Sequence, residues 1–384
     1  ETNPLPDESD GTDSYGSYFR SALHIRRHIN ELQLDYEYVA PAQVLTGNVL
    51  STYPLTILPF TSALAPDVVG RLVEYVRNGG VLLADLRGCR TNANGKPDAD
   101  STMLRTLFGI KRTNDAAIYA ASTVQLSGSD FGIGPIPMDM ATFGHEGLTT
   151  ADAKALAHHA DGTPAVFVRP LGKGLAIYLN FVLPKYDIGT RELVRQVCER
   201  AGIKRRITAE SVDGETLPPR CYELNTFSRS GIDVHGFIRD HRRCTDSPAT
   251  RIRFQDARHT YDIRAGKYLE MTASADTALS PGETLLLARL PYRVSNLRLS
   301  ILPATPLAGM ALLLTAAVSS EGNAPPGDHI VHLEFTAPDG HRVPHYAANL
   351  LAEGGKLNHQ ISLALNDPPG NWKIHATDVL TGTT

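Results

Sequence analysis

Short hydrophobic runs alternate with amphipathic segments in the first half of the chain. Apolar residues recur every three or four positions over 18–32, which predicts a helix, and DYEYV at 35–39 predicts a short strand after it. LTILPF at 55–60 and VLLADL at 81–86 are continuous apolar runs, typical of strands covered on both faces. Between them, residues 66–76 predict a helix that begins at a proline and ends at Asn-Gly-Gly. This alternation indicates an α/β layer built on a parallel sheet.

The pattern weakens over residues 87–165, where small and polar residues dominate and only 102–108 predicts a helix. It returns at 165–168 and 175–181, two apolar strands separated by a Gly-Lys-Gly turn. A helix over 190–201, ended by a glycine, closes the α/β layer. We therefore expect one α/β domain over residues 17–206.

Beyond residue 206 the hydrophobic period changes to short alternating segments separated by Gly, Pro, Asp or Asn about every ten residues. This spacing is typical of all-β sandwiches. The segments are 236–239, 249–254, 260–263, 284–288, 331–335 and 360–365. Prolines at 303 and 306 and the turn-rich stretch 321–328 predict two β modules, 207–300 and 301–384.

The longest apolar run, LAGMALLLTAAV at 307–318, predicts a buried strand, because a helix that crosses a bilayer needs about 20 residues. A membrane is therefore not an expected partner. Residues 1–16 are rich in Pro, Gly, Ser and acidic residues and predict a flexible arm or linker. The chain begins at Glu1, without Met or an apolar leader, so we expect that a segment was removed or that a longer polypeptide contains this one. The sequence favours neither a cytoplasmic nor an extracytoplasmic location.

Composition places the chain among globular proteins, with 42% hydrophobic and 20% charged residues in 384. Its 37 Lys and Arg residues against 41 Asp and Glu give a net charge of −4, and no long basic stretch indicates nucleic acid as a partner. Four cysteines without a CxxC pair give no zinc-site spacing. Two of them, Cys221 and Cys244, would bridge only in an oxidising compartment, and separate thiols are the favoured alternative.

Cys89 follows an apolar strand, where parallel sheets present reactive side chains, so it is a candidate nucleophile. His145 and Glu146, in a Gly-His-Glu-Gly stretch, are the candidate partners. A nucleophile elbow needs small flanking residues and a helix directly after the thiol, whereas Arg90 and a long polar loop follow here. We therefore expect no catalytic residue in this chain, and a cysteine hydrolase or amidase is the alternative.

No metal or cofactor is expected. His24 and His28 share a helix face, but Arg26 and Arg27 lie beside them, so a solvated basic face is favoured over a metal site. The tandem pair at 158–159 is expected at the surface.

Two glycine pairs also fail as cofactor motifs. Gly132 and Gly134 lack the third glycine of a dinucleotide fingerprint, and Gly172-Lys173-Gly174 lacks the Ser or Thr of a P-loop. We interpret both as turns.

Six aromatic residues in the β half are candidate stacking platforms for a sugar ring, although aromatic residues of this kind more often form core. They are Tyr222, Phe227, Tyr261, Tyr268, Tyr292 and Trp372.

Three stretches together carry a resemblance: YFRSALHIRRHINELQLDYEYV at 18–39, LTILPFTSALAPDVVGRLVEYVRNGGVLLADLR at 55–87 and GKGLAIYLNF at 172–181. They resemble the trimerisation domain of family 42 β-galactosidases, a class I glutamine-amidotransferase-like, flavodoxin-like fold. The resemblance implies a non-catalytic domain that lies beside a TIM barrel, which carries two catalytic glutamates, and that contributes to a trimer or dimer. The first parallel strand of the family is not visible before Tyr18, and no barrel fits in this chain.

The β half is similar to C-terminal modules of large bacterial glycoside-hydrolase-like proteins. TYDIRAGKYLEMTASADTALSPGETLLLARLPY at 260–292 resembles a β-sandwich, and 328–382 resembles an immunoglobulin-like or macroglobulin-like module. Turns are expected at 338–340 and 366–370, with Trp372 anchoring the last strand. The leading hypothesis is an accessory, non-catalytic region of a carbohydrate-active protein. A cysteine hydrolase and a carbohydrate-binding module are the alternatives.

Overall fold

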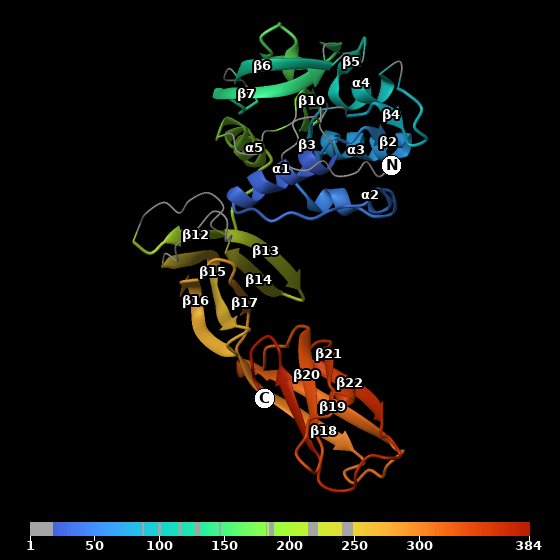
Figure 1. The fold of residues 1–384 in the computed structure, drawn as a ribbon, viewed down its shortest axis with the longest axis vertical. Coiled ribbons are helices and arrows are strands. Elements are labelled where there is room, and N and C mark those ends of the chain that lie inside the picture. The colour runs from blue at the N-terminus through green and yellow to red at the C-terminus, as the bar shows by residue number, and fades with distance from the viewer. Residues whose placement is uncertain are drawn as a thin grey trace. The chain divides into compact units, whose positions relative to one another are not determined.

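A computed structural model describes residues 18–86, 88–98, 101–114, 117–126, 131–145, 147–181, 183, 188–213, 222–239 and 249–384. The chain forms two compact units, an α/β unit of residues 1–32 and 36–205 and a β unit of residues 33–35 and 206–384 (Figure 1). The arm expected at 1–16 and the Cys221–Cys244 alternative lie outside the described residues.

The α/β unit is built on a five-stranded sheet in the order β1-β3-β11-β10-β9. Strands β1 (Leu55–Leu58), β3 (Val81–Ala84) and β11 (Gly174–Leu179) are mutually parallel. Strands β10 (Pro164–Leu171) and β9 (Lys154–His158) continue the sheet in antiparallel pairing. The expected parallel sheet is thus confirmed for three strands, and the sheet as a whole is mixed because β10 and β11 form a hairpin across the Gly172 turn.

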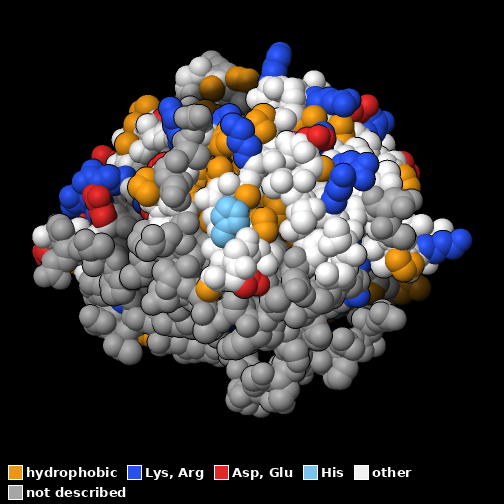
Figure 2. All heavy atoms as spheres, turned by 90° about the horizontal axis from the view of Figure 1, so that it is seen from above, with side chains coloured by type: hydrophobic (Ala, Val, Ile, Leu, Met, Phe, Trp, Pro, Cys, Tyr) orange, Lys and Arg blue, Asp and Glu red, His pale blue; other side chains and the backbone are white. Residues whose placement is uncertain are grey.

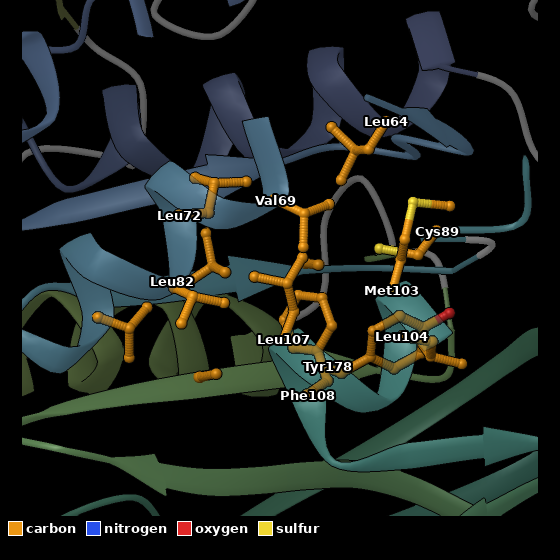
Figure 3. Close-up of a cluster of buried hydrophobic side chains, with 14 of the residues drawn as sticks. Leu64, Val69, Leu72, Leu82, Cys89, Met103, Leu104, Leu107, Phe108 and Tyr178 are labelled. Carbon is orange, nitrogen blue, oxygen red and sulfur yellow. The ribbon is translucent and has the colours of Figure 1, made fainter. Parts of the chain in front are cut away.

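Helix α3 (Pro66–Arg77) connects β1 to β3 and covers the sheet with a buried apolar stripe. Its residues Val69 and Leu72 pack into one core with Leu82 of β3 and Tyr178 of β11 (Figure 3). Gly174 permits this close contact, because a Cβ there would lie 2.1 Å from the Val76 carbonyl oxygen. The helix begins at its proline and ends before Asn-Gly-Gly, as its sequence predicts.

The remaining elements of this unit surround the sheet. They are α1 (Tyr18–Glu31), α2 (Pro41–Thr46), the 3-10 turn η1 (Val49–Thr52), β2 (Ala63–Leu64), β4 (Thr91–Asn92), α4 (Thr102–Phe108), β5 (Ile110–Arg112), β6 (Ala117–Leu126), β7 (Ile136–His145), β8 (Leu148–Thr150) and α5 (Ile188–Arg200). The strand expected at 35–39 is wrong, because this segment is irregular and pairs with no described strand. The weakly patterned region holds the β6–β7 hairpin, which pairs over ten residues.

The β unit contains a six-stranded sheet and two three-stranded sheets. The first has the order β12-β15-β17-β14-β13, with β16 paired to β15, and the others have the orders β18-β19-β22 and β21-β20-β23. The strands are β12 (Ile207–Ser211), β13 (Tyr222–Arg229), β14 (Ile232–Arg239), β15 (Thr250–Asp262), β16 (Lys267–Thr277), β17 (Thr284–Leu290), β18 (Val294–Leu302), β19 (Ala311–Ser320), β20 (His329–Thr336), β21 (Ala348–Ala352), β22 (Lys356–Ser362) and β23 (Lys373–Asp378). Two short 3-10 turns, η2 (Glu321–Asn323) and η3 (Pro344–Tyr346), complete the unit.

The predicted strand at 307–318 is β19, which begins four residues later and alternates buried and exposed positions. Residues 338–340 form the expected turn, and the Trp372 indole N–H donates to the Pro368 carbonyl oxygen at 3.1 Å. The Trp372 ring meets Tyr346 edge-on at 6.2 Å. This contact anchors the start of β23, as the sequence predicts.

A polar relay with a buried centre at His329 and Asp378 lies in the core of the β unit. The Gly327 N–H donates to the Tyr292 hydroxyl at 2.7 Å, and this hydroxyl lies 2.8 Å from His329 Nε2. His329 Nδ1 lies 2.9 Å from Asp378 Oδ1, and neither side chain is exposed. The Tyr292 hydroxyl, both ring nitrogens of His329 and the Asp378 carboxylate are all hydrogen-bonded if the Tyr292 O–H donates to His329 Nε2 and the His329 Nδ1–H donates to Asp378 Oδ1. The hydrogen-bond pattern therefore places a proton on Nδ1 of His329.

Candidate functional site

The carboxyl ends of β1, β3 and β11 meet at one edge of the sheet, the position at which α/β folds usually build ligand sites. Asp85 follows β3 directly and is 1% exposed. Its carboxylate accepts hydrogen bonds from the Ser21 hydroxyl of α1 and from the Phe60 backbone N–H, which follows β1. Burial raises the pKa of Asp85 to about 7, and these two hydrogen bonds oppose that rise. Asp85 therefore ties α1 and the end of β1 to the end of β3.

Cys89 lies at the same edge but faces the hydrophobic core. Its side chain is fully buried among Leu64, Met103 and Leu104 (Figure 3). Burial raises the pKa of the Cys89 thiol to about 12, against the opposing charge of Arg112. The residue has a φ of +55°, in the left-handed region that few side chains adopt. The Cys89 thiol is therefore buried and neutral.

Arg112 of β5 holds the loop that carries Cys89. Its guanidinium donates to the carbonyl oxygens of Gly88 at 3.0 Å and Cys89 at 3.4 Å. A Cβ at Gly88 would lie 2.9 Å from the Tyr178 ring, so the loop approaches β11 closely. The loop is thus fixed by contacts to two neighbouring strands.

The histidines of α1 are buried, and the expectation of a solvated basic face is wrong for them. His24 donates from Nδ1 to the Leu183 carbonyl oxygen at 2.6 Å. His28 Nε2 lies 3.4 Å from the Thr190 hydroxyl of α5, and its side chain is fully buried. Their stripe therefore faces the protein, and backbone and hydroxyl partners compensate the burial of the rings.

The tandem histidines divide between surface and interior. His158 is exposed, as expected, whereas His159 is 2% exposed and donates from Nε2 to the Asn180 carbonyl oxygen at 3.0 Å. Burial lowers the pKa of His159. The surface expectation is therefore wrong for His159.

No arrangement of His145 and Glu146 around the Cys89 thiol is described. The backbone of His145 ends β7 and pairs with Ala117, and Glu146 lies outside the described residues. The charged groups that act on the Cys89 thiol are Arg112 and Asp98. Among the described residues, no group of three His, Cys, Asp or Glu side chains has a metal-binding arrangement.

Most of the candidate aromatic platforms are covered. Tyr222 and Tyr261 are 3% exposed and Tyr292 is 5% exposed, so all three belong to the core of the β unit. Only Phe227, at 69%, is mostly exposed, while Tyr268 and Trp372 are half-buried. A continuous stacking surface is therefore not formed by these six residues.

Asp85 was missed by the sequence analysis, although a carboxylate directly after an apolar strand is a readable signal. The Asp85 carboxyl, the Cys89 thiol and the Tyr178 phenol are all at most 1% exposed. A substrate would have to open the core to reach them. The hydrogen bonds of Asp85 fix the edge of the sheet, and its carboxyl can bind a proton. None of these three groups is exposed to solvent.

Among the described residues visible in Figure 2, Lys and Arg side chains are scattered among hydrophobic and uncharged ones. No helix in the described part of the chain has the length and apolar character needed to cross a membrane.

Comparison with known families assigns the α/β unit. Residues 18–204 match the family described as the β-galactosidase trimerisation domain. This range corresponds to the described part of the α/β unit. The α/β unit therefore matches the β-galactosidase trimerisation domain family, over about half of the chain.

Solved structures support the same fold. The β-galactosidase from Bacillus circulans sp. alkalophilus aligns with a TM-score of 0.55 at 16% identity, over 71% of this chain and 38% of that chain. Gan42B, a family 42 β-galactosidase, aligns with a TM-score of 0.54 at 14% identity, over 71% and 36%. The β-galactosidase from Rahnella sp. R3 aligns with a TM-score of 0.51 at 16% identity, over 70% and 36%. No curated protein sequence matches the chain.

The structural similarity extends beyond the trimerisation domain. Residues 18–204 make up about half of the 384 residues, whereas the alignment covers 71% of the chain. The structural alignment therefore includes part of the β unit. The chain spans 38% or less of the length of these three β-galactosidases.

Proposed function

We propose that this chain is the accessory region of a glycoside hydrolase of the β-galactosidase type, and that its α/β unit assembles the protein into trimers. The observation that carries the proposal is the match of residues 18–204 to the trimerisation domain family, together with the shared fold. The catalytic carboxylates then belong to a TIM barrel outside this chain, as the family resemblance implies. The barrel and copies of this chain are the proposed partners.

The geometry of the α/β unit supports an assembly role over catalysis. The best-placed reactive groups, Asp85 and Cys89, lie inside the core, where burial keeps the thiol protonated. A domain that serves assembly needs a stable scaffold rather than an accessible nucleophile. We assign Cys89 to packing, and we place the α/β unit in the amidotransferase-like, flavodoxin-like class with two β modules after it.

The proposal is tested by assaying the purified chain with a chromogenic β-galactoside. We expect no turnover above a buffer control, and none restored by a thiol reductant. Hydrolysis that survives purification and is abolished by Cys89→Ala, but not by Cys198→Ala, would contradict the proposal and favour the cysteine hydrolase. The Cys198 variant is a matched control because that thiol is also buried, with a pKa raised to about 12.

A further inference from the structure

A pocket of about 420 Å³ opens at the amino edge of the sheet in the α/β unit, opposite the edge that holds Asp85 and Cys89. Its walls come from α2, from η1 with the residues up to Pro54, and from the second half of α3 with the following turn. Ligand pockets for small molecules begin at about 300 Å³, so this volume is large enough for one sugar ring.

The floor of the pocket depends on a glycine. Gly80 lines it, and a Cβ at this position would lie 2.2 Å from the Tyr75 ring. The Tyr75 hydroxyl donates to the Val81 carbonyl oxygen at 3.1 Å, which fixes the ring against the backbone. Tyr53, whose hydroxyl donates to Glu37, forms a second aromatic wall. Both aromatic side chains are therefore held in place without a ligand.

The rim supplies donors and acceptors without net charge. Asn48 and Asn78 line the pocket and are exposed, and among the described residues neither side-chain amide has a hydrogen-bond partner. Arg71 and Glu74 form an ion pair at 3.2 Å, with side chains that are 55% and 63% exposed. An exposed pair of this kind contributes little stability, so its groups can rearrange toward a ligand at small cost. Amides, a guanidinium and a carboxylate around aromatic rings suit a ring with several hydroxyl groups.

We propose that this pocket binds a single neutral sugar unit. The balanced charge of Arg71 and Glu74 argues against an anionic or cationic ligand. The Asn48 and Asn78 amides can both donate to and accept from sugar hydroxyls. This inference goes beyond the assembly role and does not depend on it. For a ligand of this size, a dissociation constant in the low millimolar range is expected.

The test is a calorimetric or ligand-observed NMR titration of the full chain with galactose and with glucose. Asn48→Trp places a large side chain at the rim, at a position whose own amide caps no helix. Asn94→Trp, at an exposed turn away from the pocket, is the matched control. We expect saturable binding by the native chain and by Asn94→Trp, and at least a tenfold loss in Asn48→Trp. If Asn48→Trp does not fold, Arg71→Ala replaces it and is expected to weaken binding at least threefold, with Arg77→Ala unaffected.

Three outcomes would overturn the proposal. They are the absence of saturable binding by either sugar, equal binding by Asn48→Trp, and tighter binding of glucuronate that weakens with salt, which would show an anion site. A changed native mass in Asn48→Trp without any sugar binding would assign the pocket to a protein contact and would also overturn it. Loss of sugar binding with an intact trimer leaves the assembly role standing, so the two proposals fail separately.

Discussion

Replacing Asp85 by Asn should stabilise the α/β unit at alkaline pH and change its response to pH. The pKa of Asp85 is raised from its ordinary value near 3.8 to about 7 because the carboxyl is buried. Between these values the folded state holds a proton that the unfolded state has released, so stability falls as the pH rises from about 4 to about 7. Above this range the native protein carries the full cost of a buried carboxylate, and an amide carries none.

The size of the effect follows from the shift. About three pKa units at about 1.4 kcal/mol each give roughly 4 kcal/mol as the upper limit of the cost above pH 7. Asparagine keeps the acceptor for the Phe60 N–H and offers its own N–H group to the Ser21 hydroxyl oxygen, so both contacts survive. We therefore expect Asp85→Asn to be about 2–4 kcal/mol more stable than the native protein at pH 8, and within about 1 kcal/mol of it at pH 4.

Urea unfolding followed by ellipticity at 222 nm provides the measurement, because all the described α-helices lie in the α/β unit. The single tryptophan, Trp372, lies in the β unit, so its fluorescence follows that unit separately. Asp67→Asn, at the exposed start of α3, is the control for removing one negative charge. The reasoning is refuted if the difference between Asp85→Asn and the native protein does not grow from pH 4 to pH 8, or if Asp67→Asn shows the same growth.

Three further predictions follow from the buried groups. Tyr292→Phe removes the hydroxyl that the Gly327 N–H and His329 Nε2 contact, so it should lower the unfolding free energy of the β unit by about 2–4 kcal/mol. Urea unfolding followed by Trp372 fluorescence measures this loss, and a loss below about 0.5 kcal/mol would contradict the relay. Peptide-resolved alkylation at pH 8 should leave Cys89 unmodified in the folded protein and modify it fully in urea, because its thiol is covered and its pKa is near 12; rapid labelling of the folded protein would contradict this burial. Gly174→Ala forces a Cβ to within 2.2 Å of two backbone oxygens and should lower the unfolding free energy by more than about 2 kcal/mol, as measured by ellipticity at 222 nm. Gly70→Ala, which has open space and no positive φ, is the control and should cause no comparable loss.

The elements that could be predicted are those whose pattern is set by local sequence. The helix at 66–77 has a proline start, a five-residue apolar stripe and a glycine stop, and the structure reproduces all three. The apolar runs at 55–58 and 81–84 are strands as predicted; the second, inside the sheet, is buried at every position, whereas the first, at the sheet edge, is partly buried. Residues 35–39 alternate in the same way as a strand, but within the described part of the chain the edge strand β1 pairs with β3 and the segment pairs with no strand.

The candidate site depended on tertiary contacts that no local pattern carries. His24 and His28 lie beside two arginines, yet their face of α1 is turned inward and meets the Leu183 carbonyl and Thr190. The position of Cys89 after a strand was readable, whereas its burial depends on Met103 and other side chains of α4. The mixed sheet was also not readable, because the reversal at β10 depends on a hairpin turn rather than on the apolar runs themselves.

The central claim, that the α/β unit assembles this protein, is tested most directly by the native mass of the purified chain. Native mass spectrometry and light scattering over a range of protein concentrations measure it without a substrate. A trimer is expected, with three times the chain mass of 41.6 kDa. A species of 41.6 kDa that persists at the highest concentrations would contradict the account.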